Sequence, residues 1–178
     1  MSFRRCVRRN VPEGNPRKRA VCGAALLFLA GCGGSGAAKE QIVRGTGYRF
    51  SAPADWTVKR APRIVQASQG IELVSVTRYE LLRSFRPALW DHVVPELDRA
   101  AQGVAEQQKG RVASSRTITV SGRRARSYDI AYSREGKDLV ERITFVLRGK
   151  TEYYLLCRYE GGGDTGACDR LRATFTLG

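Results

Sequence analysis

The chain has 178 residues, a formal net charge of +14 and a hydrophobic fraction of 42%. This length fits one domain of roughly 100 to 150 residues behind a leader, so the chain is long enough to bury a single sizeable core. Because His92 is the only histidine, the sequence excludes hydrolases of the His-Glu-x-x-His type, which bind zinc through two histidines.

The first 31 residues have the order of a bacterial export signal. Seven basic residues and one acidic residue, Glu13, lie within residues 1–19, and an apolar run follows at residues 20–29. That run is about half of the ~20 residues that a helix needs to cross a bilayer. We therefore predict a cleaved signal peptide over residues 1–31 and no permanent transmembrane helix.

The apolar run ends in Leu29-Ala30-Gly31-Cys32, which resembles the lipobox of bacterial lipoproteins. In that family the small residues allow the lipoprotein signal peptidase to cut before the cysteine. The resemblance implies that Cys32 becomes the first mature residue and carries acyl chains such as palmitate, which anchor the protein to the outer face of a membrane. The alternative is an ordinary cleaved signal followed by an incidental cysteine. Glycine-rich residues 32–41 are predicted to form a flexible tether before a single domain at residues 42–178.

Removal of residues 1–31 lowers the net charge to +8, because 24 basic and 16 acidic residues remain. This surplus favours anionic partners such as lipid headgroups or wall polymers, whereas nucleic acid is not expected outside the cell. The densest basic cluster is Arg123, Arg124 and Arg126, beside an expected turn at Ser121-Gly122. Its simplest interpretation is the solvated tip of a hairpin, with recognition of an anionic partner as the alternative.

Loss of the leader and acylation of Cys32 leave Cys157 and Cys168 as an even pair. In an oxidising compartment such a pair indicates a disulfide. Cys157 lies in an expected strand and Cys168 in an expected helix, so the bond would join that helix to the sheet. A zinc site is not expected at these cysteines, because no nearby histidine or second Cys-x-x-Cys supplies the remaining ligands.

Alternation of apolar and polar residues predicts strands in the first half of the domain, at residues 47–53, 55–58, 63–69 and 71–79. The first hairpin is expected to turn near Gln69-Gly70. Between Pro87 and Gln108, apolar residues recur every three to four positions, which predicts one long amphipathic helix with a kink at Pro95. Its apolar stripe is expected to pack against the sheet, because the opposite face mixes acidic and basic residues.

After this helix the apolar pattern changes to period two and predicts four strands. They are separated by short turns at Ser121-Gly122, Glu135-Gly136 and Gly149-Lys150. Links this short cannot carry parallel crossovers, so the four strands form an antiparallel meander. Asp164-Thr165 then caps a short helix that ends near Ala173. The predicted fold class is α+β, an antiparallel β-sheet covered by one long helix and a short C-terminal helix.

This order of elements resembles the PsbP-like fold, an α/β/α sandwich, over residues 43–177. The resemblance rests on the segment Gly47-Tyr48-Arg49-Phe50-Ser51-Ala52-Pro53-Ala54-Asp55-Trp56 and on Ala173-Thr174-Phe175 at the end of the last helix. The family includes extrinsic photosystem subunits, Ran-binding transport factors and many bacterial lipoproteins. It has no shared catalytic residues to carry over, so the resemblance implies a fold but no function.

No catalytic, cofactor-binding or metal-binding residues are predicted. The sequence has no Gly-x-Ser-x-Gly or Gly-Lys-Ser motif, and His92 is expected on the surface of its helix. Residues 161–166 fit Gly-x-Gly-x-x-Gly, but only twelve residues follow them, too few for a dinucleotide-binding unit, so we interpret them as a loop. Glu72, Asp129 and Glu141 lie on expected strands, and sequence distance cannot establish whether such acids form a carboxylate pair.

The favoured hypothesis is a non-catalytic binding or accessory module of the cell envelope, which is anchored outside the cytoplasm and binds an anionic polymer or a protein. Two alternatives remain open. One is an unrecognised envelope enzyme that acts on wall or lipid material with acids brought together only in three dimensions. The other is a carrier of a small apolar ligand between the sheet and the long helix, drawing on the tyrosine-rich strands.

Overall fold

The computed structural model describes residues 39–178, which form two antiparallel sheets and two α-helices. The smaller sheet has the order β1-β2-β9, and the larger sheet has the order β3-β4-β5-β8-β7-β6. The strands are β1 (Glu40–Gly45), β2 (Tyr48–Pro53), β3 (Thr57–Arg60), β4 (Ile64–Gln69), β5 (Glu72–Phe85), β6 (Arg111–Val120), β7 (Arg123–Arg134), β8 (Lys137–Glu160) and β9 (Thr176–Leu177). The helices are α1 (Trp90–Gln107), preceded by the 3₁₀ turn η1 (Pro87–Leu89), and α2 (Gly166–Thr174).

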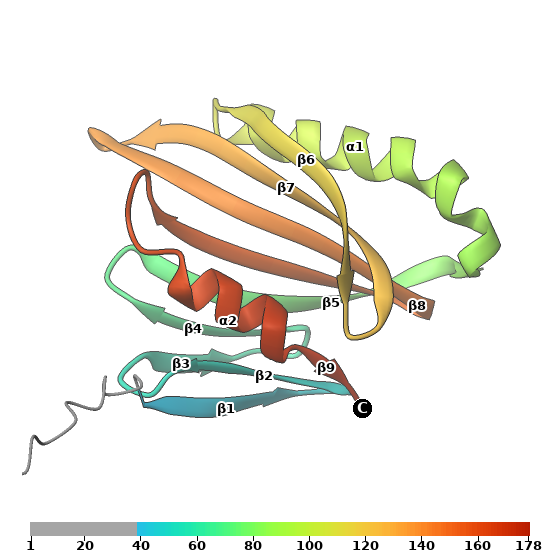
Figure 1. The fold of residues 1–178 in the computed structure, drawn as a ribbon, viewed down its shortest axis with the longest axis horizontal. Coiled ribbons are helices and arrows are strands. Elements are labelled where there is room, and N and C mark those ends of the chain that lie inside the picture. Colours follow the sequence, from blue (N-terminus) through green and yellow to red (C-terminus); the bar gives the residue numbers. More distant parts are fainter. Residues whose placement is uncertain (1–38) are drawn as a thin grey trace, which may run out of the picture. The chain divides into compact units, whose positions relative to one another are not determined.

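The larger sheet packs against other elements on both faces (Figure 1). On one face, Ala101 of α1 packs with Tyr128 of β7 in one hydrophobic cluster. On the other face, Phe50 of β2 and Phe175 after α2 pack with Val76 of β5 in a second cluster. Along residues 153–157 of β8, successive residues alternate between the two clusters, as the pleat requires. The predicted α+β class is confirmed, but the sheets make up most of the domain and a small sheet shares the α2 layer.

Strand β8 turns back on itself midway, and Figure 1 shows its two arms side by side. The first arm pairs with β7 through residues 137–146, and the second pairs with β5 through residues 149–158. At the far ends of the arms, the N–H of Gly161 donates to the carbonyl of Asp138 at 2.7 Å. Gly149, where the arms meet, has a φ of +55°. The turn predicted at this glycine is therefore present, and the four-strand meander is confirmed.

The helices also lie where the sequence predicts them. Helix α1 runs through Pro95 without a break. At the start of α2, the carboxylate of Asp164 accepts a hydrogen bond from the N–H of Gly166 at 2.8 Å. Thr165, the other predicted cap, instead donates its hydroxyl to Asp169 at 3.0 Å. Of the two predicted capping residues, Asp164 bonds a backbone N–H at the start of α2, and the Thr165 side chain does not.

Strands β1 and β9 were not predicted from the sequence, and the boundaries of two other strands differ from the prediction. Strand β1 lies before the first predicted strand, and its alternation is hard to recognise because Ile42 is 62% exposed. Strand β3 starts only at Thr57, because Asp55 belongs to the preceding turn. Strand β5 continues to Phe85, well past its predicted end; in this extension it pairs with β8 at Glu80 and at Phe85, with an irregular register between the two positions. Strand β1 is defined by its pairing with β2, which the local pattern does not contain.

The turns gather at two opposite ends of the domain. The chain enters at Lys39, whose carbonyl accepts from the N–H of Ala54 in the turn between β2 and β3. At the other end, Ser121 in the turn between β6 and β7 accepts from the N–H of Leu177 through its hydroxyl. We call this second end the distal end, and the turn after β1, the turn between β3 and β4, the turn of β8 and the start of α1 also lie there.

Candidate functional site

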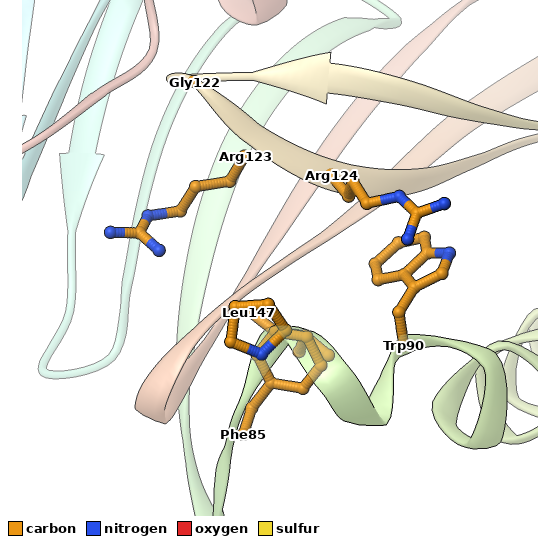
Figure 2. A pocket seen from close by; sticks show the side chains of 7 residues that line it. Phe85, Trp90, Gly122, Arg123, Arg124 and Leu147 are labelled. Atoms are coloured by element: carbon orange, nitrogen blue, oxygen red, sulfur yellow. The ribbon is translucent and has the colours of Figure 1, made fainter.

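A pocket of about 220 Å³ lies at the distal end, where the end of β5 and the start of α1 approach the hairpin of β6 and β7. We call it the Trp90 pocket, and Figure 2 shows the side chains that line it: Phe85, Pro87, Trp90, Gly122, Arg123, Arg124 and Leu147. Its lining combines an apolar floor with two arginines and contains no acidic residue.

The apolar floor is fixed by the segment that joins β5 to α1. Pro87 occupies the first position of η1, where a proline has no N–H to lose and a suitable φ. The turn brings Trp90 back against Phe85, and the two rings meet edge to face with their centroids 6.5 Å apart. Trp90 is only 3% exposed, and so is Leu147 on β8. These contacts hold the floor in one arrangement before any ligand arrives.

The arginine rim is fixed by the turn between β6 and β7. Ser121 and Gly122 have φ values of +50° and +71°, the pattern of a two-residue hairpin turn whose twist matches the strands. The guanidinium of Arg124 lies 5.4 Å from the centre of the Trp90 ring. Figure 2 shows Arg124 beside this ring and Arg123 extending away from it. Among residues 39–178, neither arginine forms an ion pair, so the N–H groups at the edge of each guanidinium can bind an anion.

Arg126, the third member of the basic cluster, has a different role. Its guanidinium pairs with Asp98 of α1 at 3.1 Å, and the hydroxyl of Tyr128 donates to the same carboxylate at 2.6 Å. These bonds attach α1 to the sheet. The interpretation of the cluster as a solvated hairpin tip is therefore incomplete. Arg123 and Arg124 are exposed at the tip, as expected. However, Arg124 also contacts an aromatic ring, and Arg126 has a structural role.

The acids on the strands do not form a catalytic pair. Asp129 faces the α2 layer, where Nε of Arg142 donates to its carboxylate at 2.7 Å. Glu141 faces the α1 layer, is 4% exposed and accepts from the hydroxyl of Tyr132 at 3.0 Å. The larger sheet separates the two carboxylates. Glu72 lies apart from both, beside the turn that begins β5.

The electrostatic surroundings of these acids fit structural roles. Burial alone would raise the pKa of Asp129, but hydrogen bonds from Arg142 and Ser114 outweigh it, and the pKa is held below its ordinary value. Burial, with the charge of Glu141 nearby, raises the pKa of Tyr132. Asp129 therefore remains ionised and Tyr132 remains neutral at ordinary pH, so neither is suited to exchange a proton in a reaction.

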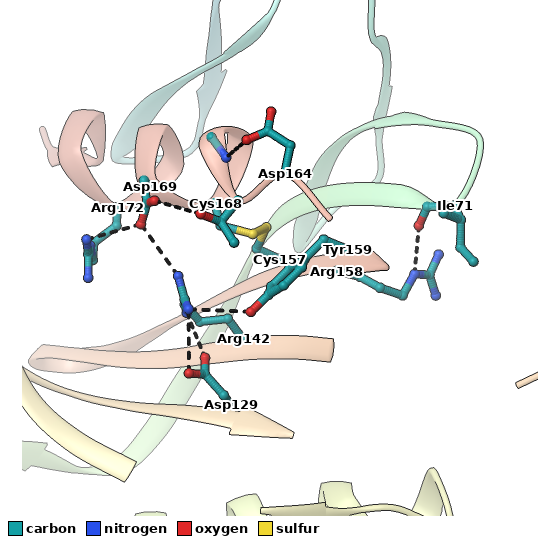
Figure 3. The surroundings of a disulfide bond; sticks show 12 residues. Ile71, Asp129, Arg142, Cys157, Arg158, Tyr159, Asp164, Cys168, Asp169 and Arg172 are labelled. Atoms are coloured by element: carbon teal, nitrogen blue, oxygen red, sulfur yellow. Dashed lines mark hydrogen bonds and ion pairs between the residues drawn. A yellow bond between two sulfur atoms is a disulfide. The ribbon is translucent and has the colours of Figure 1, made fainter. Parts of the chain in front are cut away.

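Figure 3 shows the polar cluster beside the disulfide of Cys157 and Cys168, whose Cα atoms are 5.3 Å apart. Arg142 lies between strand and helix, because it binds Asp129 on β7 and also approaches Asp169 of α2 at 3.5 Å. The disulfide and this arginine attach α2 to β8 side by side. The glycine-rich segment between the two cysteines is a loop whose backbone bonds lead back to β8.

The other residues considered in the sequence analysis are His92, possible metal ligands and Cys32. His92 is exposed on α1 and forms no ion pair within residues 39–178. In the same part of the chain, no group of three or more His, Cys, Asp or Glu side chains is placed to hold a metal ion. No helix described there is long and apolar enough to span a membrane. Cys32 and the predicted signal peptide and lipobox lie outside the described residues.

Neither protein-family models nor curated proteins gave a match to this chain. Solved structures did. Cyanobacterial PsbP (CyanoP) from Synechocystis sp. PCC 6803 is 17% identical, with a TM-score of 0.54 over 84% of this chain and 99% of CyanoP. The fold is PsbP-like. The resemblance seen in the sequence is confirmed at this level, and at such identity it establishes the fold alone.

Two further structures are similar. A protein from Bacteroides thetaiotaomicron VPI-5482 is 12% identical, with a TM-score of 0.56 over 79% of this chain. The match covers only 48% of the Bacteroides protein, so this chain spans about half of its length. LpqN of Mycobacterium tuberculosis, described as involved in cell envelope biogenesis, is 15% identical, with a TM-score of 0.49 over 78% of this chain and 90% of LpqN.

Proposed function

We propose that this chain is an extracytoplasmic lipoprotein, anchored to a bacterial membrane through Cys32, whose domain is a non-catalytic accessory module of the cell envelope. The domain binds the end of an anionic envelope polymer in the Trp90 pocket. The observation that carries the proposal is the meeting of an apolar floor with two arginines that have no carboxylate partner within residues 39–178. The disulfide supports the location, since such bonds persist in oxidising compartments.

The pocket suits an anionic group attached to a small apolar or ring-shaped body. The guanidinium of Arg124 lies over the Trp90 ring and forms no ion pair within residues 39–178, so its N–H groups can donate two parallel hydrogen bonds to a phosphate or carboxylate. The apolar body then covers Phe85 and Leu147. At about 220 Å³ the pocket is smaller than the ~300–1,000 Å³ of sites that enclose whole small molecules. It therefore holds the terminal group of a longer molecule.

The tryptophans of the chain provide a direct binding assay. Only Trp56 and Trp90 are present, so a Trp56→Phe variant reports on the pocket alone. We expect its fluorescence to change and saturate on titration with octyl phosphate, and to respond much less to octyl glucoside. Adding Arg124→Gln should weaken octyl phosphate binding about tenfold, since a charge-assisted hydrogen bond contributes ~1.5–3 kcal/mol.

Arg134→Gln is the matched control, because Arg134 is exposed, forms no ion pair within residues 39–178 and lies at the end opposite the pocket. Its dissociation constant for octyl phosphate should stay within about twofold of that of the Trp56→Phe parent. Equal weakening by both arginine variants, or equal responses to the charged and uncharged octyl compounds, would contradict the assignment of the pocket to anions.

Anchoring is tested separately from ligand binding. In the bacterial host, Cys32→Ala is expected to move the protein from the membrane fraction to the soluble extracytoplasmic fraction, because the acyl chains supply the membrane affinity. Cys22→Ala is the control, since Cys22 does not follow lipobox residues. Fractionation and intact mass of the wild-type protein should agree, with acyl chains found only on Cys32. Persistent membrane attachment of Cys32→Ala would refute the lipid anchor.

A further inference from the structure

A second hollow at the distal end, separate from the Trp90 pocket, contains four arginines. It has a volume of about 320 Å³ and lies between the turn after β1, the turn between β3 and β4, and the adjoining part of β5. Arg44, Arg60, Arg63 and Arg78 line it, and no aspartate or glutamate does. We call it the four-arginine hollow.

Backbone hydrogen bonds hold together the segments that contain the arginines of this hollow. Arg60 is the last residue of β3 and pairs with β4. The turn is closed by Ala61 and Ile64, whose backbones exchange hydrogen bonds of 2.9 and 3.3 Å. The N–H of Arg78 on β5 donates to the carbonyl of Arg63 at 2.8 Å. Three of the four arginines therefore start from neighbouring, hydrogen-bonded positions.

A buried tyrosine forms part of the lining and supports β1 beside it. The ring of Tyr48 lies so close to Gly45 that a Cβ at that position would be 2.1 Å from it. Its hydroxyl donates to the carbonyl of Val76 at 3.0 Å. Burial raises the pKa of Tyr48 to about 12, so this wall of the hollow carries no negative charge at ordinary pH. Arg44, the fourth arginine, projects from the strand that contains Gly45.

The arginines of this hollow differ in their ion pairing from the arginines that join strands of the larger sheet. Arg116, Arg142 and Arg158 each pair with an acid on a neighbouring strand. None of the four arginines in the hollow forms an ion pair within residues 39–178. Guanidinium groups gathered in this way repel each other, and an anion bound among them relieves the repulsion.

We propose that the four-arginine hollow binds phosphate groups of a molecule that carries several of them close together. Phosphate matches the fork of N–H donors on arginine and accepts two parallel hydrogen bonds from it. One phosphate does not satisfy four arginines, which is why neighbouring phosphates are required. The phosphates come from a soluble oligophosphate or from the headgroups of an anionic membrane. This site and the Trp90 pocket share no lining residue, so either proposal can fail alone.

The test uses the full chain at low ionic strength, with calorimetric titration of inorganic tripolyphosphate in one arm and flotation with phosphatidylglycerol vesicles in the other. The variant Arg60→Ala/Arg63→Ala is expected to weaken binding about tenfold in the arm that holds the true source of phosphate. The control variant Arg111→Ala/Arg134→Ala removes the same charge from exposed, unpaired arginines at the opposite end. It should weaken binding by no more than about threefold, through long-range electrostatics.

Weaker binding by Arg60→Ala/Arg63→Ala than by the control variant, in either the tripolyphosphate or the vesicle experiment, supports the site. The experiment that shows the difference identifies the source of the phosphate. The proposal is overturned if the two double variants lose binding affinity equally, or if neither experiment shows a loss of affinity. Folding is checked by melting: without ligand, Arg60→Ala/Arg63→Ala should melt no lower than the wild-type protein, because its substitutions relieve repulsion. Tripolyphosphate should raise the melting temperature of the wild-type protein and of Arg124→Gln alike if it is the ligand. A rise that depends on Arg124 would place the anion in the Trp90 pocket and refute the proposal.

Discussion

Replacement of both Cys157 and Cys168 by alanine is expected to lower the free energy of unfolding by ~3 kcal/mol. The bond closes a loop across a sequence separation of 11 residues, and its loss increases the conformational freedom of the unfolded chain. Both cysteines are buried, at 2% and 3% exposure. Alanine is preferred to serine, because two buried hydroxyls without partners would add a second cost. Denaturant titration of the two proteins without reductant measures the difference.

The reductant provides the control for this prediction. A strong reductant should lower the stability of the wild-type protein by a similar amount and should leave the alanine variant unchanged. The intact mass of the non-reduced chain should be lower than that of the reduced chain by two hydrogens. If the wild-type mass does not change on reduction, or its stability is insensitive to reductant, the disulfide is absent from the protein in solution.

Most of the larger sheet was predictable because its turns carry strong local signals. Ser121-Gly122 and Glu135-Gly136 have left-handed backbone angles at both residues, which few residue pairs other than such glycine-containing ones adopt easily. Between these turns apolar residues alternate regularly, because successive residues of a strand point to opposite faces of the sheet. The long helix was predictable for the same reason, through its own period.

The missing strands and the candidate sites depend on contacts between distant segments. Strand β9 has two residues, and only its pairing with β2 makes it a strand. The Trp90 pocket joins residues from β5, α1, β7 and β8, and no spacing in the sequence indicates that Arg124 reaches Trp90. The basic cluster was a usable signal for the pocket rim. The arginines of the second hollow are scattered between residues 44 and 78, so strand register alone brings them together.

Replacement of Arg142 by methionine is expected to destabilise the domain by about 2 to 3 kcal/mol, somewhat less than the ~3–5 kcal/mol for a fully buried pair. The side chains of Arg142 and Asp129 are 14% and 17% exposed, so water only partly screens their interaction. Methionine keeps most of the volume but leaves the carboxylate of Asp129 half-buried without its main donor. Denaturant titration at pH 7 measures the loss. Arg99→Met is the control, because Arg99 and Glu96 form a largely exposed pair and should contribute no more than about 0.5 kcal/mol.

The pH dependence of this variant separates an electrostatic cause from a packing cause. The pKa of Asp129 is lower in the folded protein than in the unfolded chain, so its ionised form stabilises the wild-type fold above the unfolded value of ~3.9. That stability is lost as the pH falls through the lower, folded pKa. In Arg142→Met, protonation instead relieves a buried carboxylate that keeps only Ser114 and Arg116 as partners, and the deficit relative to wild type should shrink below about pH 4. If the difference in free energy of unfolding between Arg142→Met and the wild-type protein stays constant from pH 7 to pH 3, Arg142 acts through packing against Tyr159 and α2. The ion pair would then contribute nothing measurable to holding α2 on the sheet.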